Sequence, residues 1–290
     1  MTLAPATDDV SDRSPAEGPR ASTGALIAWA LYDWGNSAHP TLITTFVFAA
    51  YFTQAVAADP VAGIAAWGTA TSLAALAVAL VSPVAGAIAD NTGRRKPWLG
   101  VATALAVLAT AALWFVRPSP DYAVAALVLV AAGTFFFELG MVFYNAMLPT
   151  LVPRAMIGRL SGWAWGLGYA GGLAALVCAL FGFIKTDAPW FGVGTIEAAN
   201  VRAVTVLAAA WFAVFALPLF LFTPDSRASG SGMAPASSTR MFFFGARIAA
   251  ASGAMEGAIT TSTKSLAISV AVWASSVRLT ATMPPNALSV

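Results

Sequence analysis

Five polar side chains that interrupt apolar stretches are the residues best suited to chemistry: Asp33, Asn36, His39, Glu138 and Asn145. In helices, Asp33 and Asn36 share a face because they are three residues apart, and Glu138 and Asn145 share one because they are seven apart. These pairs predict a polar cavity in which Asp33 or Glu138 binds a proton or a cationic group of a solute. The structural alternative places Asp33 at the lipid headgroups and gives Glu138 an interhelical hydrogen bond.

His39 has two interpretations. It precedes Pro40, whose missing N–H predicts a kink or an irregular start of the apolar segment. An imidazole changes its charge near neutral pH, so His39 could act as a pH switch. The alternative, which we favour, is a structural polar contact.

The elements that position these residues are membrane-spanning helices. The chain is 59% hydrophobic and 10% charged, with a mean hydropathy of +0.76, whereas soluble domains are about a quarter charged. In lipid every backbone polar group needs an internal partner, which long apolar runs without alternation achieve only as helices. We therefore predict an all-α integral membrane protein in which residues 24–224 form one six-helix bundle, with spans within 24–57 and at about 63–89, 98–116, 123–144, 160–184 and 201–222.

The basic residues predict the orientation, because cytoplasmic loops of membrane proteins are rich in Lys and Arg. One side of the predicted membrane would carry eight basic residues and the other side three: Arg13, Arg20, Arg94, Arg95, Lys96, Arg154, Arg159 and Arg227, against Arg117, Lys185 and Arg202. We therefore expect a multi-pass protein of the inner, cytoplasmic membrane with a cytoplasmic N-terminus. Residues 1–23 are polar and lack a signal-peptide pattern, which predicts a disordered cytoplasmic tail.

The stretch 86–98 between the second and third spans contains Gly86, Asp90, Gly93, Arg94 and Arg95. Three adjacent cations cannot lie in hydrocarbon and so mark a short turn. Asp90 is poorly placed against the dipole at the end of its own helix. Either the neighbouring arginines or the N-terminus of another helix would stabilise it.

The fifth span begins with closely spaced glycines: Gly158, Gly162, Gly166, Gly168 and Gly172. Glycines four residues apart allow another helix to approach its backbone closely. This face could be a rocking surface or a static packing surface, and spacing does not separate the two.

Several classes of function are excluded. One cysteine, Cys178, and one histidine cannot form a metal set, a disulfide within the chain or a convincing catalytic triad. The basic residues lie in turns and form no stripe for nucleic acid. We expect no cofactor, no metal and no enzymatic activity, with the lipid bilayer and a small-molecule solute as partners.

Four stretches together resemble the bacterial branch of the autophagy-22-like, or UMF1, group of major facilitator transporters: WALYDWGNS at 29–37, ADNTGRRKPWL at 89–99, YNAMLP at 144–149 and GRLSGWAWGLGYAGG at 158–172. The resemblance implies two six-helix bundles that rock about a solute path, with residues 86–95 as a cytoplasmic gating motif. It also implies export or uptake of a small solute, with amino acids and proton coupling as expectations. Gly35, His39 and Pro40 depart from the family pattern, which usually has Ala, an aromatic and a small residue there.

Only one bundle is present, so transport would require the missing C-terminal half, a second copy in a homodimer or another chain. Residues 225–290 lack a spanning segment, which predicts a poorly ordered tail that is unstructured or only loosely helical. Their mixture of Ser, Ala and Arg resembles translation out of frame. The alternative to a transporter is therefore a non-transporting remnant of a truncated or frameshifted gene.

Overall fold

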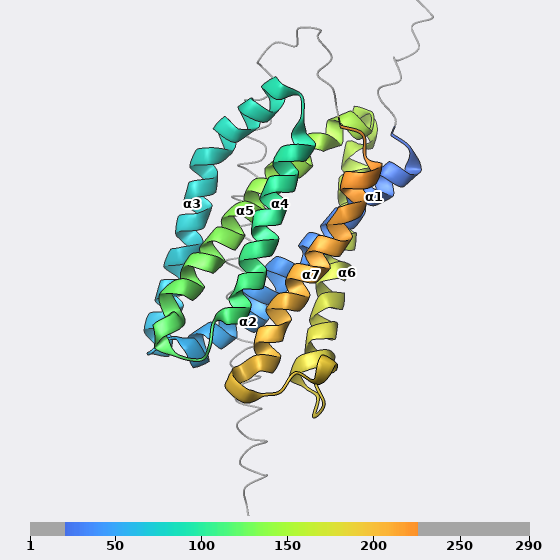
Figure 1. The fold of residues 1–290 in the computed structure, drawn as a ribbon. Helices are drawn as coiled ribbons and strands as arrows, with labels where there is room; N and C mark the ends of the chain where they lie inside the picture. Colours follow the sequence, from blue (N-terminus) through green and yellow to red (C-terminus); the bar gives the residue numbers. More distant parts are fainter. Residues whose placement is uncertain (1–20, 226–290) are drawn as a thin grey trace, which may run out of the picture. The chain divides into compact units, whose positions relative to one another are not determined.

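The computed structural model describes residues 21–225, except for the side chains of Asp90 and Asn91. The tails predicted at 1–23 and 225–290 lie almost entirely outside the described residues. All regular elements of the described part are helical, which confirms the all-α prediction (Figure 1): α1 Thr23–Asn36, η1 His39–Phe46, α2 Val47–Tyr51, η2 Phe52–Val56, α3 Pro60–Thr92, α4 Arg95–Ala112, η3 Leu113–Phe115, η4 Pro120–Tyr122, α5 Ala123–Leu151, α6 Arg154–Ala179, η5 Leu180–Ile184, η6 Trp190–Gly192, η7 Ile196–Ala198 and α7 Ala199–Phe222.

Five helical stretches of the described residues are long and apolar enough to cross a membrane: Pro60–Ala89, Arg95–Phe115, Pro120–Leu151, Arg154–Ile184 and Ile196–Phe222. They correspond to the second to sixth predicted spans. Several extend beyond the predicted limits; α3 starts at Pro60, α5 ends at Leu151 and α6 starts at Arg154. The reason is that apolar runs mark only the hydrocarbon depth, whereas a helix continues into the polar headgroup region.

The first predicted span consists of successive helical pieces. Ser22 caps α1, where its side chain accepts a hydrogen bond from the Ala25 amide at 3.3 Å. The backbone then changes to a π-helix that begins at His39, beside Pro40. Because proline cannot donate a backbone hydrogen bond, the expected irregularity falls at this position.

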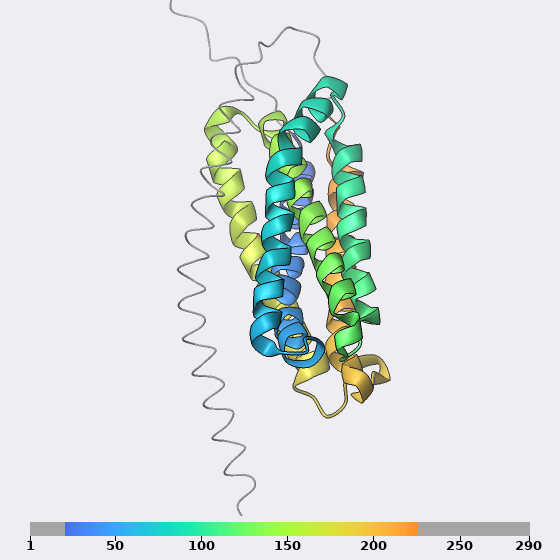
Figure 2. The same ribbon diagram turned by 90° about the vertical axis from the view of Figure 1, so that its left-hand side faces the viewer.

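The described helices form two groups (Figures 1 and 2). α3 and α4 both pack against α5, and α6 and α7 both pack against α1, while α4 and α7 join the groups. One apolar cluster includes Trp29, Leu99 and Tyr144, and the other includes Phe52, Leu113 and Phe183. The bundle therefore has a core near each of its two ends.

Candidate functional site

The polar residues of α1 lie in the protein interior. The side chain of Asp33 is 8% exposed and that of Asn36 is 3% exposed. The Asn36 amide Nδ2 donates to Asp33 Oδ1 at 3.2 Å and also reaches Met141 Sδ of α5 at 3.2 Å. An amide group has two N–H donors, so it can make both contacts. Asp33 and Asn36 thus share a face and form a polar pair at the contact between α1 and α5.

The predicted α5 pair lies beside them at the molecular surface. Glu138 and Asn145 are both exposed, and Asn145 Nδ2 donates to the Met141 backbone carbonyl at 2.9 Å. Glu138, Met141 and Asn145 follow a spacing of three and then four residues, which aligns them along one face of the helix. Met141 therefore connects the exposed polar face of α5 to the buried pair on α1.

His39 lies apart from Asp33 and Asn36. Its side chain is 1% exposed, and Nδ1 is 2.9 Å from Thr110 Oγ1 of α4. Its ring stacks on Phe137 of α5 with a centroid separation of 5.3 Å. The polar residues of the first span thus occupy two places. Asp33 and Asn36 lie near α5 and α6, whereas His39 is enclosed by α4 and α5.

The glycines of α6 also fall on two faces. A Cβ atom at Gly168 would lie 2.9 Å from Ser37 Oγ, and one at Gly172 would lie 2.5 Å from Thr41 Oγ1. Gly171, which the spacing argument did not include, is the tightest, because its Cβ would collide with the Trp34 carbonyl oxygen. On this face the backbone of α6 packs directly against the first span.

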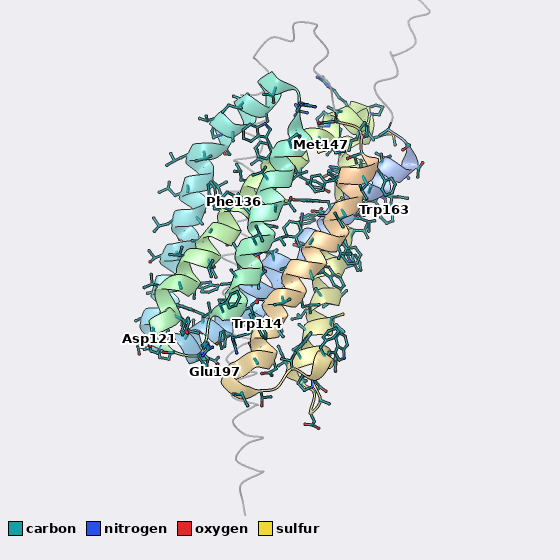
Figure 3. The ribbon with its side chains drawn as sticks, in the orientation of Figure 1. Trp114, Asp121, Phe136, Met147, Trp163 and Glu197 are labelled. Atoms are coloured by element: carbon teal, nitrogen blue, oxygen red, sulfur yellow. The ribbon has the colours of Figure 1, made fainter. Side chains whose placement is uncertain are left out.

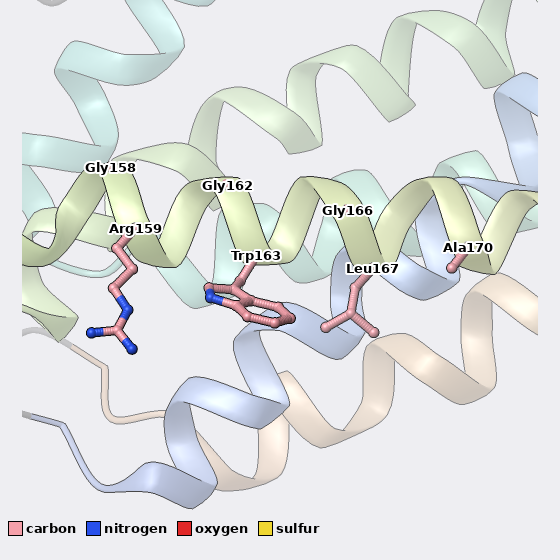
Figure 4. A pocket seen from close by; sticks show the side chains of 7 residues that line it. All are labelled: Gly158, Arg159, Gly162, Trp163, Gly166, Leu167 and Ala170. Carbon is pink, nitrogen blue, oxygen red and sulfur yellow. The ribbon is translucent and has the colours of Figure 1, made fainter.

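The other three predicted glycines of α6 are not in contact with another helix of the described residues. A Cβ atom at Gly158, Gly162 or Gly166 would meet nothing within 4 Å. They line a shallow groove of about 490 Å³ together with Arg159, Trp163, Leu167 and Ala170 (Figure 4). Of the five glycines of the predicted packing face, only Gly168 and Gly172 are therefore in contact with the first span.

The turn between α3 and α4 is very short. Gly93 ends α3 with φ of +64°, a left-handed conformation that glycine adopts without strain. Arg94 is exposed and caps α4, and a Cβ at Gly86 would meet nothing within 4 Å. The backbone of Asp90 belongs to the last turn of α3, and its predicted ion pair lies outside the described side chains.

The cations after this turn bind the ends of two other helices. Arg95 Nη1 donates to the Ala146 carbonyl of α5 at 2.6 Å. Lys96 Nζ donates to the carbonyls of Phe220 at 2.9 Å and Thr223 at 2.6 Å, at the end of α7. The Phe220 and Thr223 carbonyls lie in the last turn of α7 and directly after it, where a carbonyl has no partner within the helix, so Lys96 supplies a donor there and opposes the helix dipole.

Two further contacts were not identified from the sequence: one joins the first and third sequence stretches, and the other joins the first stretch to α4. Trp29 stacks on Tyr144 at 4.3 Å between centroids; its Nε1 donates to the Tyr144 carbonyl at 3.4 Å, and the Tyr144 hydroxyl donates to the Trp29 carbonyl at 3.1 Å. Tyr32 and Thr103 share a hydrogen bond of 2.8 Å between their hydroxyl groups. Aromatic residues near a predicted membrane boundary were the only signal, and it points equally well to interface anchors.

At the opposite end of the bundle, Arg202 of α7 forms hydrogen bonds with two neighbouring segments. Its Nε donates to the Glu197 carbonyl at 3.1 Å, its Nη1 donates to the Trp114 carbonyl at 3.0 Å, and its guanidinium lies 5.0 Å from the centre of the Trp114 ring. Arg117 forms a 3.4 Å ion pair with Glu197. Figure 3 shows Trp114, Asp121 and Glu197 at this end and Met147 and Trp163 at the other.

Within residues 21–225, no group of three His, Cys, Asp or Glu side chains is arranged to hold a metal ion. The site is therefore a set of polar and aromatic contacts that brings the four sequence motifs together. The stretch 29–37 contacts 144–149 through Trp29 and Tyr144, and it contacts 158–172 through Trp34 and Gly171. The stretch 89–99 contacts 144–149 through Arg95.

Comparisons with known proteins agree with these motifs. A family model described as vacuole effluxer Atg22 like matches residues 66–157. The uncharacterized MFS-type transporter YxiO of Bacillus subtilis (strain 168) is 28% identical over 195 residues, which cover 66% of this chain and 45% of that protein. The chain thus spans about half the length of this relative, and no solved structure is significantly similar. The two matches confirm the family resemblance that the four stretches predict.

Proposed function

We propose that this chain, a major facilitator transporter sequence of the Atg22-like kind, forms the N-terminal bundle of a secondary transporter for a small solute. The observation that carries the proposal is the exposed polar face of α5, with Glu138 and Asn145 in a helix that is long and apolar enough to span a membrane. A carboxyl group is expensive to expose to hydrocarbon, so this face should meet a water-filled path or a second bundle. The buried Asp33–Asn36 pair lies just behind it, across Met141.

Asp33 and Glu138 are the groups that would bind a coupled proton or a cationic group of the solute. Asp33 is held by Asn36 close to α6, since a Cβ at Gly168 would lie 3.6 Å from Asp33 Cγ. The absence of a side chain at residue 168 makes room mainly for the Ser37 hydroxyl and the Asp33 carbonyl oxygen, which would lie 2.9 and 3.3 Å from a Cβ atom. Amino acids are the solutes suggested by the family, and a proton is the coupling ion we propose.

The proposed orientation in the membrane is based on the basic residues at one end of the bundle. The end with Arg94, Arg95 and Lys96 also contains the start of α1 and the end of α7. Its cations would face the cytoplasm, which places the N-terminus on the cytoplasmic side of the inner membrane. The path would be completed by a C-terminal bundle or by a second copy of this chain.

The test is uptake of a radiolabelled amino-acid mixture into proteoliposomes with an imposed pH gradient. The wild-type chain, Asp33→Asn and Glu138→Gln would be compared with Asp121→Asn, which changes an exposed carboxyl group in the short helix η4. We expect saturable, gradient-dependent uptake that Asp33→Asn reduces at least tenfold and Asp121→Asn leaves unchanged. Reconstituting monomer and dimer fractions separately would show whether a homodimer is required.

Uptake no higher than in empty liposomes, from folded and inserted protein in both fractions, would contradict transport by this chain alone. Such a result would favour a non-transporting remnant or a requirement for the C-terminal half. Co-reconstitution with the C-terminal bundle of the Bacillus relative would separate these two interpretations. Restored uptake would support the half-transporter proposal, and continued inactivity would support the remnant.

A further inference from the structure

The imidazole of His39 occupies an unusual position in the described bundle. It lies at the start of a π-helix, and its side chain is 1% exposed. Thr110 of α4 contacts Nδ1, Phe137 of α5 covers the ring, and a Cβ added at Gly133 of α5 would lie 3.1 Å from His39 Cε1. Gly133 thus leaves room for an imidazole where a larger residue would displace it.

The hydrogen bonds around Thr110 determine which ring nitrogen carries the proton. The Thr110 hydroxyl donates its single hydrogen to the Ala106 carbonyl at 2.8 Å. With its hydrogen directed to that carbonyl, Thr110 Oγ1 accepts a hydrogen bond from His39 Nδ1, so we assign the proton of the neutral ring to Nδ1. In a neutral ring the other nitrogen, Nε2, then has a free lone pair.

That lone pair has no donor within the part of the protein that the structure describes. His39 Nε2 is fully buried there without a hydrogen-bond partner from residues 21–225. Two further buried polar atoms of the described residues also lack a partner, Trp34 Nε1 and Thr134 Oγ1. Buried polar groups nearly always have a partner, which an ordered water molecule or a ligand supplies where the protein does not.

We propose that His39 Nε2 is a binding site for a small neutral hydrogen-bond donor in the middle of the bundle. The donor is an O–H or N–H group, which either a water molecule or the transported solute can supply. This site is distinct from the Asp33–Asn36 pair, and its existence does not depend on the proposed transport. It assigns a role to the departure of this chain from its family at residues 39 and 40.

Because His39 is the only histidine in the chain, ¹⁵N-histidine labelling gives a spectrum from one imidazole. Solid-state NMR of the full chain in lipid bilayers, purified without a histidine tag, would report the protonation and hydrogen bonding of both nitrogens. We expect a protonated Nδ1 and an unprotonated Nε2 shifted upfield, the direction in which accepting a hydrogen bond moves an imine nitrogen. Magnetisation transfer from water protons to Nε2 without solute would identify water as the donor. A shift that appears only with an added amino-acid mixture would identify the solute.

A protonated Nε2, or an Nε2 signal at the position of an unbonded imine nitrogen with and without amino acids, would overturn the proposal. Thr110→Val and Thr110→Ser provide the matched controls. The valine variant removes the acceptor for Nδ1 and should change the Nδ1 signal, whereas the serine variant retains the hydroxyl and should leave both signals in place. Failure of uptake in proteoliposomes would leave this spectrum unaffected, so the two proposals can fail separately.

Discussion

The close contact between α6 and α1 gives the sharpest test of the packing. A Cβ atom at Gly171 would lie 2.8 Å from Trp34 Cα and 2.9 Å from Trp34 C, and would collide with the carbonyl oxygen. All three are backbone atoms, so no side chain can rotate away. Gly166 lies on the open face of the same helix, where a Cβ meets nothing within 4 Å. Gly171→Ala and Gly166→Ala therefore form a matched pair.

The expected difference follows from this geometry. Both substitutions replace glycine by alanine within α6, so the gain in helix propensity, up to about 1 kcal/mol, is common to both and cancels. What remains is the overpacking at Gly171, which in tightly packed interiors costs about 1–3 kcal/mol. At roughly 2–4 °C per kcal/mol for a chain of this size, Gly171→Ala should melt roughly 2–12 °C below Gly166→Ala.

The lone cysteine supplies the assay. Cys178 lies on α6 and is partly buried, so a thiol-reactive fluorogenic dye reports its exposure as detergent-solubilised protein unfolds. Melting curves of the wild type and both variants would be compared at equal detergent concentration. Equal melting temperatures for the two variants, or a lower one for Gly166→Ala, would refute the assignment of the packed and open faces.

Two further predictions concern the cations that join helix ends. Lys96→Met should lower the melting temperature, because two partly buried carbonyls at the end of α7 lose their donor, at about 1 kcal/mol for each hydrogen bond; Arg94→Met, which changes an exposed cation in the same turn, should not. Arg202→Met should destabilise the opposite end by a comparable amount, because it removes the donors to the Glu197 and Trp114 carbonyls; the same dye assay measures it, and an unchanged melting temperature would contradict the role given to Arg202.

Much of the fold could be predicted because lipid leaves the chain few choices. An apolar run of sufficient length must be helical, so the second to sixth spans follow from hydropathy. Pro40 also predicts a local irregularity, but the choice of a π-helix depends on contacts with other elements that the sequence does not reveal. Helix limits are harder to predict, because polar residues occur both in the last turns of a helix and in the loop that follows, so hydropathy does not separate the two.

The candidate site could be predicted only in part. Asp33 and Asn36 follow from helical spacing, and they do share a face. Four-residue glycine spacing, in contrast, describes both Gly158–Gly162–Gly166 and Gly168–Gly172, and only a structure shows which set the first span covers. The roles of Arg95 and Lys96 could not be predicted, because basic residues in a turn are expected to face water.

The arrangement of α6 also constrains how this bundle can move. At Gly168, Gly171 and Gly172 its backbone meets the first span without room for a methyl group, so sliding there would require the whole contact to separate. At the turn between α3 and α4, Lys96 links α4 to the end of α7 in the same way. For the proposed transport we therefore expect rigid-body rocking of the whole bundle, with its moving contacts on the faces left open: the groove along Gly158, Gly162 and Gly166 and the polar face of α5. A spin label at residue 162 should then change its distance to a label on a partner bundle, while the distance between labels on α1 and α6 stays constant.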